Sequence, residues 1–93
     1  MAHYKLWGVY TPLLEQWTRE TGARMEALVD NPEHELEVEY FSDSDPRVAL
    51  YGWQHFPIFV ALKHDQPFRK IIGKLALEDY EAWLKELSWT LDV

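Results

Sequence analysis

The four histidines are the side chains with the widest range of chemistry in this 93-residue chain, because imidazole can bind a metal or carry a proton near neutral pH. None of them shows the His-x-x-x-His or Cys/His spacing of a metal site. His34-Glu35 is as typical of a solvated turn as of a metal ligand. The histidines are His3, His34, His55 and His64. We therefore expect no metal site.

Other reactive constellations are also missing from the sequence. The chain has no cysteine, which excludes thiol–disulfide exchange by these residues. Its four glycines are isolated, so no phosphate-binding loop is predicted, and no serine lies in a nucleophile-elbow context. His55 is the most interesting titratable residue because it stands close to Pro57, although a lone loop histidine is usually a surface polar group. We predict a protein that is not an enzyme and that needs no cofactor.

A strand, a turn and a second strand occupy the stretch from Trp53 to Gly73. Residues 57–62 are apolar and partly β-branched, which favours a strand buried on both faces. Residues 63–66 are polar and turn-length, and residues 68–72 read as a shorter partner strand. Proline cannot donate to a sheet ladder, so Pro57 suits the first position of its strand. The stretch therefore predicts a β-hairpin.

The segment before residue 30 predicts a strand followed by a helix. Residues 4–10 are rich in strand-favouring types, and Thr11-Pro12 is typical of a helix start. A stripe of residues three or four apart is expected to face the core through about residue 29. Gly22 disfavours a helix interior, so one long helix and two shorter helices both remain open. The stripe consists of Leu14, Trp17, Thr21, Met25 and Leu28.

The remaining segments complete an alternating order of elements. Residues 36–41 alternate apolar side chains with glutamates, which predicts a strand near a sheet edge. Residues 42–46 predict a turn into a short helix over residues 47–52. A final amphipathic helix is predicted over residues 77–88, followed by a loosely docked tail. The predicted order is β-α-β-α-β-β-α, an α/β fold with a four-stranded mixed sheet and helices on both faces.

Several short motifs are similar to the second half of a thioredoxin in order and spacing. They are Asp45-Pro46, Ala49, Tyr51-Gly52, Phe56-Pro57, Ile72-Gly73 and Leu75, within residues 43–88. The resemblance implies a thioredoxin-like fold in which Pro57 follows a cis peptide bond. Oxidoreductases of that superfamily carry Cys-x-x-Cys at the start of the first helix, where residues 10–16 of this chain hold no cysteine. The resemblance thus implies a redox-inactive member.

The same resemblance implies a peptide-binding surface. In that superfamily, backbone groups beside the cis-proline pair with an extended segment of a partner. Two interpretations of Trp53 and Phe56 stay open: they are binding anchors, or they pack onto the first helix. Transferred by position, the surface consists of Tyr10, Thr11, Pro12, Trp53, Gln54, His55, Phe56 and Pro57.

Composition and net charge limit which classes of protein and of binding partner fit the chain. A 93-residue chain that is 47% hydrophobic predicts one domain spanning residues 1–93, and no stretch is apolar enough for a membrane span. The start of the chain lacks the pattern of a signal peptide, so we expect a cytoplasmic protein. A net charge of −7 disfavours nucleic acid and anionic membranes as partners. The acidic residues cluster in residues 33–45 and 78–86, as solvated faces or as a surface for a basic partner.

Five tryptophans are many for one small core. Trp53 and Trp89 lie outside the predicted core stripes, and they would mark contact surfaces if both were exposed. The leading expectation is a redox-inactive thioredoxin-like domain that acts as a protein-interaction or assembly-chaperone module, binding a basic or extended segment of another protein. The alternative is a structural subunit of a larger assembly that uses exposed tryptophan surfaces.

Overall fold

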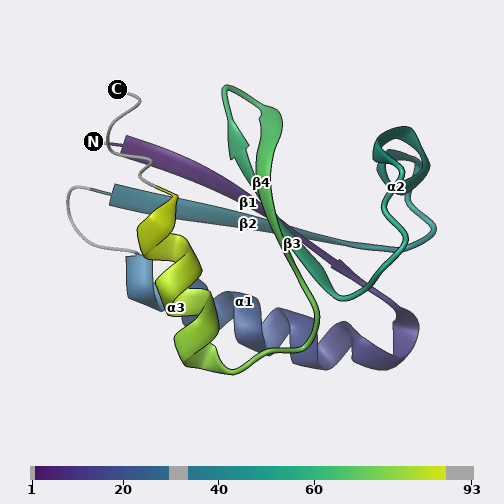
Figure 1. Cartoon of the computed structure of the whole chain (residues 1–93), viewed down its shortest axis with the longest axis horizontal. Helices are drawn as coiled ribbons and strands as arrows, with labels where there is room; N and C mark the ends of the chain where they lie inside the picture. The colour runs from purple at the N-terminus through teal and green to yellow at the C-terminus, as the bar shows by residue number, and fades with distance from the viewer. Residues whose placement is uncertain (1, 30–33, 88–93) are drawn as a thin grey trace.

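A four-stranded sheet forms the centre of the computed structural model, which describes residues 2–29 and 34–87 (Figure 1). The strands and helices follow one another in the predicted order β-α-β-α-β-β-α, with a 3-10 turn before the first helix. The elements are β1 (Ala2–Tyr10), the 3-10 turn (Pro12–Leu14), α1 (Glu15–Val29), β2 (His34–Ser42), α2 (Pro46–Tyr51), β3 (Ile58–Lys63), β4 (Gln66–Ile72) and α3 (Leu77–Glu86).

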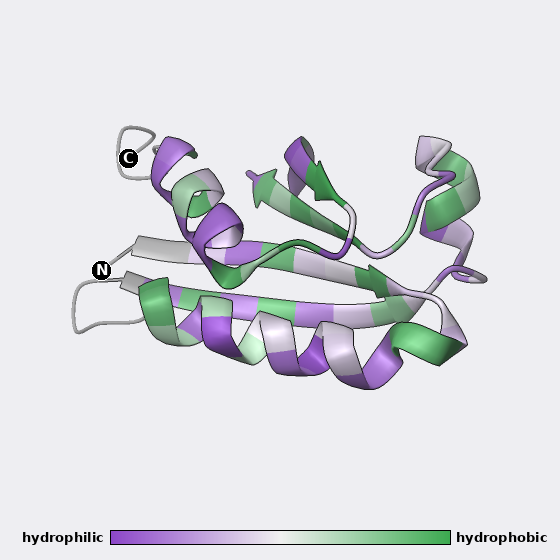
Figure 2. Ribbon diagram, turned by 60° about the horizontal axis from the view of Figure 1, so that its bottom comes forward, coloured by the Kyte–Doolittle hydropathy of each residue, from purple (hydrophilic) through white to green (hydrophobic). Residues whose placement is uncertain are grey.

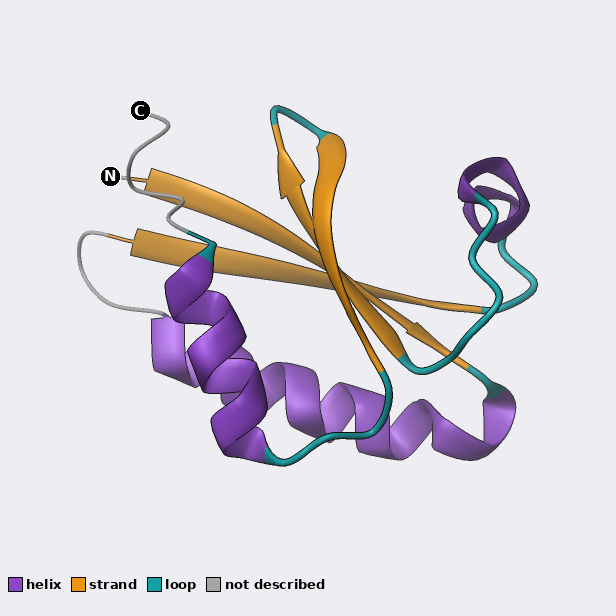
Figure 3. Cartoon of the chain, viewed as in Figure 1, coloured by secondary structure: helices purple, strands orange, loops and turns teal. Residues whose placement is uncertain are grey.

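The sheet is mixed, as predicted, with strand order β2-β1-β3-β4. β1 and β2 are parallel, whereas β3 is antiparallel to both of its neighbours, β1 and β4. β2 is an edge strand, which confirms the expectation from its exposed glutamates, and its alternation of hydrophilic and hydrophobic residues is visible in Figure 2. The hairpin of β3 and β4 crosses the β1–β2 pair steeply, so the sheet is strongly twisted (Figure 3).

Each face of the sheet carries its own apolar cluster, because successive strand residues point to opposite faces. On the face that we call the helical face, Leu6 and Phe59 pack with Met25 of α1 and Tyr80 of α3. On the other, which we call the open face, Val9 and Ile58 pack with Val48 of α2. Helices therefore lie on both faces, and α2 stands apart from α1 and α3 in Figure 1.

Helix α1 runs unbroken through Gly22, which settles the choice between one helix and two. A Cβ at Gly22 would lie 2.8 Å from two ring carbons of Tyr40. The same ring lies over Gly8 of β1, where a Cβ would come within 2.9 Å of Tyr40 Cδ1. Both glycines therefore make room for one tyrosine between the helix and the sheet.

The predicted core stripe of α1 is only partly right. Thr21 and Met25 are buried and Trp17 packs against the core, but Leu28 is 45% exposed. Thr18 and Gly22, which lie outside the predicted stripe, are also buried. Small residues suit these buried positions because they let the helix approach the strands closely. Thr11 stands at the cap position, yet its side chain makes no capping hydrogen bond.

The hairpin turn is shorter than predicted. Only His64 and Asp65 form it, both at positive φ (53° and 63°), so β4 already begins at Gln66. Positive φ at both central residues matches the twist of a two-residue hairpin, and aspartate tolerates it. Pro67 therefore lies within β4, where its missing N–H is tolerated because β4 is an edge strand.

Helix α3 closes the helical face. Its predicted apolar stripe is confirmed, with Tyr80 fully buried and Trp83 and Leu84 packed against the same cluster. The Tyr80 hydroxyl donates to the Gly73 carbonyl (2.6 Å) and accepts from the Leu75 N–H (3.1 Å), which ties the loop before α3 to the helix. The predicted tail, residues 89–93, lies outside the described residues. No helix in the described ranges is long and apolar enough to cross a membrane.

Candidate functional site

The end of the sheet at Pro57 brings together two segments that are far apart in the sequence. Val9 and Ile58 form the last pair between β1 and β3, so Tyr10 and Pro57 stand side by side just beyond it. The Phe56–Pro57 peptide bond is cis, as the sequence resemblance implied. The Pro57 carbonyl accepts a hydrogen bond from the Gly73 N–H at 2.9 Å, which fixes the end of β4 beside it. We call this region the Pro57 end.

Local chain geometry explains how the segment before Pro57 reaches the surface. Gly52 ends α2 in the left-handed conformation (φ 71°), and the Trp53 N–H donates to the Val48 carbonyl at 3.1 Å. The chain then leaves α2 with the Trp53 side chain turned inward. Gln54 and His55 follow in neither helix nor strand and are exposed.

The site residues predicted from the sequence therefore meet at one end of the sheet but differ in accessibility. Pro12, Gln54 and His55 are exposed. Tyr10, Thr11 and Phe56 are half-buried. Trp53 and Pro57 are buried. A partner can reach this end without entering the core.

Three exposed apolar side chains at the Pro57 end were missed by the sequence prediction. Leu13 is 97% exposed in the 3-10 turn directly after Pro12. Ile72 and Leu75 are 42% and 39% exposed on either side of Gly73. Alternation along residues 68–72 could have placed Ile72 on the face of Ile58. Leu13 precedes the predicted core stripe, which begins at Leu14, and this position could have indicated its exposure.

The structure rules out an exposed anchor at Trp53, one of the two interpretations that the sequence left open. Its side chain is 9% exposed and belongs to the apolar cluster of the open face. The ring stacks on Tyr51 (centroids 5.1 Å apart) and meets Trp7 edge-on at 6.2 Å. The other interpretation is also wrong for Trp53, since these contacts lie on the face opposite the first helix. A six-residue α2 covers so little of that face that the indole itself becomes part of the core.

Arg47 covers the same cluster next to α2. Its guanidinium carbon lies 3.7 Å from the ring centroid of Phe41 and 4.9 Å from that of Trp7, a cation–π arrangement. Ion pairs to Asp45 (2.9 Å) and Glu39 (3.0 Å) hold it there. The hydrogen bond from Arg47 lowers the pKa of Asp45, and the same bond raises the pKa of Arg47. The side chain of Arg47, the second residue of α2, thus covers the cluster at Phe41 and Trp7.

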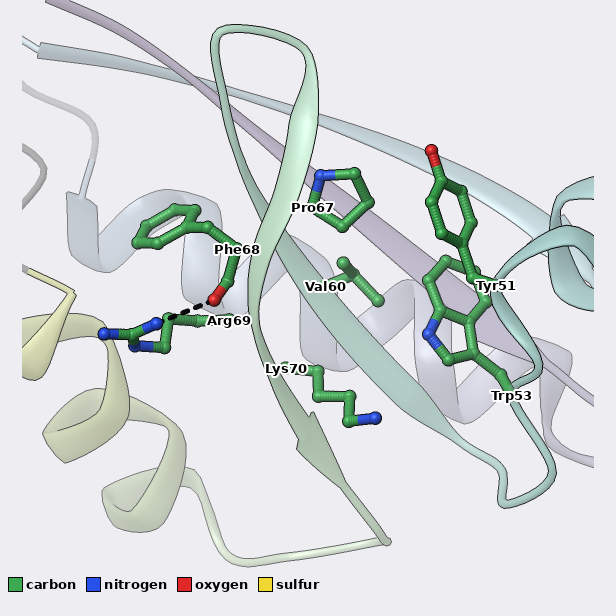
Figure 4. Close-up of a pocket in the computed structure, with 7 residues that line it drawn as sticks. All are labelled: Tyr51, Trp53, Val60, Pro67, Phe68, Arg69 and Lys70. Carbon is green, nitrogen blue, oxygen red and sulfur yellow. Dashed lines mark hydrogen bonds between the residues drawn. The ribbon is translucent and has the colours of Figure 1, made fainter.

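A groove of about 430 Å³ opens on the open face between the end of α2 and β4 (Figure 4). Val60 forms its floor, and Tyr51 and Trp53 form one wall. Pro67 and Lys70 of β4 form the other wall. The sequence prediction missed this groove, because it depends on the pairing of Val60 with Lys70 across the hairpin.

These two regions present exposed apolar side chains and a groove to the surroundings of the molecule. Among residues 2–29 and 34–87, no three His, Asp or Glu side chains gather as a metal site. No protein-family model matches the chain, and no curated protein matches its sequence. Geometry and side-chain chemistry are therefore the basis for assigning a function.

Proposed function

We propose that this chain is a redox-inactive thioredoxin-like domain that binds an extended segment of another protein at the Pro57 end. The observation that carries the proposal is the group of exposed apolar side chains on both sides of the cis-Pro57 backbone: Leu13 on one side, Ile72 and Leu75 on the other. Large apolar side chains left in water beside an accessible backbone are typical of a protein contact.

Two features support the thioredoxin-like part of the proposal. The sheet order β2-β1-β3-β4, with β3 antiparallel to its neighbours, fits the arrangement that the resemblance of residues 43–88 implies. The cis bond lies where that resemblance places it, at the start of β3. With no cysteine in the chain, the face that carries thiol chemistry in that superfamily would serve recognition alone.

An extended partner fits the Pro57 end because the backbone before Pro57 lies outside helices and strands. Main-chain groups of residues 54–56 would pair with the partner backbone, as in β-addition. Phe56, half-buried, and the exposed Ile72 would contact its side chains. An assembly chaperone is one kind of binding module that works in this way.

The negative charge of the chain indicates a second property of the partner. Glu35, Glu37 and Glu39 of edge strand β2 are exposed, and the whole chain has a net charge of −7. Basic residues flanking the bound segment would be attracted by the net negative charge of the chain and would raise the rate of association. We therefore propose an extended segment with basic flanks as the partner.

The test is quantitative capture from lysate of the source organism by the immobilised chain and its variants. We expect a Leu13→Glu/Ile72→Glu double variant to retain at least about tenfold less of the partner, because charges replace apolar contacts. Leu28→Glu is the matched control, since Leu28 is as exposed as Ile72 but lies on α1 near the other end of the sheet. Circular dichroism first establishes that all variants are folded.

Equal capture by the double variant and the native chain would contradict the proposal. That result would indicate an interface outside the Pro57 end and would favour a structural subunit, the second candidate from the sequence. That candidate was based on exposed tryptophan surfaces, and Trp53 does not provide one because it is buried. Trp89 lies outside the described residues.

A further inference from the structure

The groove on the open face holds aromatic, apolar and cationic groups in one small space. Tyr51 and Trp53 are stacked with ring planes 23° apart, and Val60 and Pro67 line the apolar remainder. Figure 4 shows Lys70 on the same side of β4 as Trp53, whereas Phe68 and Arg69 extend from the opposite side. The groove therefore has one cation at its border.

Two hydrogen-bond donors at this groove have no acceptor within the described part of the chain. The indole nitrogen of Trp53 lies on the ring edge that faces Val60 and Lys70 in Figure 4. Within residues 2–29 and 34–87, neither the Trp53 N–H nor the Lys70 ammonium has a hydrogen-bond or ion-pair partner. Both donors are thus available to one acceptor in the groove.

Charge complementarity identifies that acceptor as an anion. None of the seven lining residues is acidic, although the chain has 16 acidic residues against 9 basic ones. A carboxylate accepts hydrogen bonds from an ammonium and an indole N–H together, and such charge-assisted bonds are stronger than neutral ones. A carboxylate is therefore the group that would satisfy both donors.

The shape and lining of the groove indicate the rest of the ligand. Its volume of about 430 Å³ lies in the range of small-molecule sites. A planar ring can lie against the partly exposed Tyr51 ring and the Pro67 ring, because aromatic surfaces pack best in offset or edge contacts. A hydrocarbon ligand would leave both donors without an acceptor, and a neutral oxygen acceptor would not compensate the charge of Lys70.

We propose that this groove is a binding site for a small planar aromatic carboxylate, with its ring between Tyr51 and Pro67 and its carboxylate at Lys70 Nζ and Trp53 Nε1. The site is distinct from the exposed apolar side chains of the Pro57 end. It does not rest on the proposed protein-binding function.

The test is NMR titration of the ¹⁵N-labelled chain with 2-naphthoate, against 2-naphthamide as the matched neutral probe. A Trp53→Phe variant, checked for folding, assigns the Trp53 indole signal among those of the five tryptophans. We expect 2-naphthoate to shift the Trp53 indole signal and the Lys70 amide along one saturable curve. The amide probe should bind about tenfold more weakly, because it lacks the charge that Lys70 recognises.

Paired variants on the surface make the test specific. Lys70→Met should remove the preference for the carboxylate, whereas Lys74→Met, which changes a lysine outside the groove, should preserve it. Tyr51→Ala should weaken binding of both probes, whereas Leu50→Ala on the same helix should not. The proposal is overturned if the Trp53 signal does not move at millimolar 2-naphthoate, or if Lys70→Met keeps the native preference.

Discussion

The two faces of one sheet differ in how they are closed. On the helical face, a 15-residue helix and a 10-residue helix cover the strands, and Leu6, Phe59 and Tyr80 are fully buried. On the open face, α2 has six residues and covers only the end near Val9 and Ile58. One set of strands thus combines a dry core on one face with an accessible surface on the other, because alternate residues point to the two faces.

Side chains replace the missing helix on the open face. Arg47 lies over Phe41 and Trp7 near α2, and an ion pair between Lys5 Nζ and Asp65 Oδ1 (2.8 Å) lies at the hairpin turn. The hydrogen bond within that pair raises the pKa of Lys5 and lowers the pKa of Asp65. Between these two charged regions lies the groove over Val60. The proposed ligand site thus lies where the helical cover ends.

The largest expected effect comes from the same truncation made on each face. Leu6→Ala should lower the free energy of unfolding by about 4 kcal/mol, because the residue is fully buried and its truncation leaves a cavity in the core of the helical face. Leu62→Ala, in the neighbouring strand on the open face, should cost about 2 kcal/mol. Both leucines line a hollow of about 120 Å³, but Leu62 also borders a surface hollow of about 290 Å³, where water can take the vacated space. Urea unfolding at pH 7 measures both values.

Equal losses of unfolding free energy in Leu6→Ala and Leu62→Ala would contradict this difference between the faces. They would mean that the open face is closed as tightly as the helical face. The denaturant slope must be the same for both variants for the values to be compared.

A glycine substitution tests how closely α1 approaches the sheet. Gly22→Ala should destabilise the chain by about 2 kcal/mol, since the new methyl group meets the Tyr40 ring that Gly8 already confines. In a Tyr40→Ala background the clash is gone. The same Gly22→Ala change should then stabilise by up to about 1 kcal/mol through helix propensity. Failure of the sign to reverse in this double-mutant cycle would contradict the close packing.

A buried hydroxyl on α1 offers a stabilising change. Thr18 is fully buried, and its Oγ1 has no hydrogen-bond partner within residues 2–29 and 34–87. Thr18→Val keeps the shape and removes the unsatisfied polar group, so it should stabilise the fold by about 1 kcal/mol. Thr18→Ser, which keeps the hydroxyl and loses the methyl group, is the control and should destabilise. Thermal unfolding distinguishes the two, and a loss of stability in Thr18→Val would show that the hydroxyl has a partner in solution.

The smallest expected effect concerns the charge pair that seals the open face. Arg47 lowers the pKa of Asp45, so the pair stabilises the folded state above the unfolded pKa of about 3.9 and this contribution fades as pH falls through the lowered folded pKa. Asp45→Asn keeps the N-cap acceptor but removes the charge. It should cost about 0.5–1 kcal/mol at pH 7 and progressively less below pH 4.

Unfolding curves from pH 2 to pH 7 measure this difference, with Asp43→Asn as the control for a nearby exposed carboxylate. A cost of Asp45→Asn that stays constant down to pH 2 would show that the charge of Asp45 does not stabilise the fold.

Most of the fold could be predicted because its signals are local. Glutamates that alternate with Leu36 and Val38 predict an edge strand, and Pro46 with Gly52 delimits a short helix. The errors come from contacts between distant segments. Gly22 is favoured within the continuous helix because its lack of a side chain leaves room for the Tyr40 ring. The two-residue turn depends on positive φ at His64 and Asp65.

The candidate site was predictable only in its position. The segments around Tyr10 and Pro57 do meet, because the pairing of β1 with β3 brings them together. The role of Trp53 was not predictable, since its burial depends on how little of the open face α2 covers. Lys70 joins the groove only through the register of β4 against Val60, which no local pattern specifies.

Site-specific photo-crosslinking tests the central proposal most directly. A benzoylphenylalanine residue in place of Leu13, Ile72 or Leu28 would be activated in lysate of the source organism, and the products identified by mass spectrometry. We expect one common partner protein to be crosslinked from positions 13 and 72 and not from position 28, where the Leu28 side chain is about as exposed as that of Ile72. Crosslinking of that partner from position 28 at equal yield, or from neither position at the Pro57 end, would contradict the proposal.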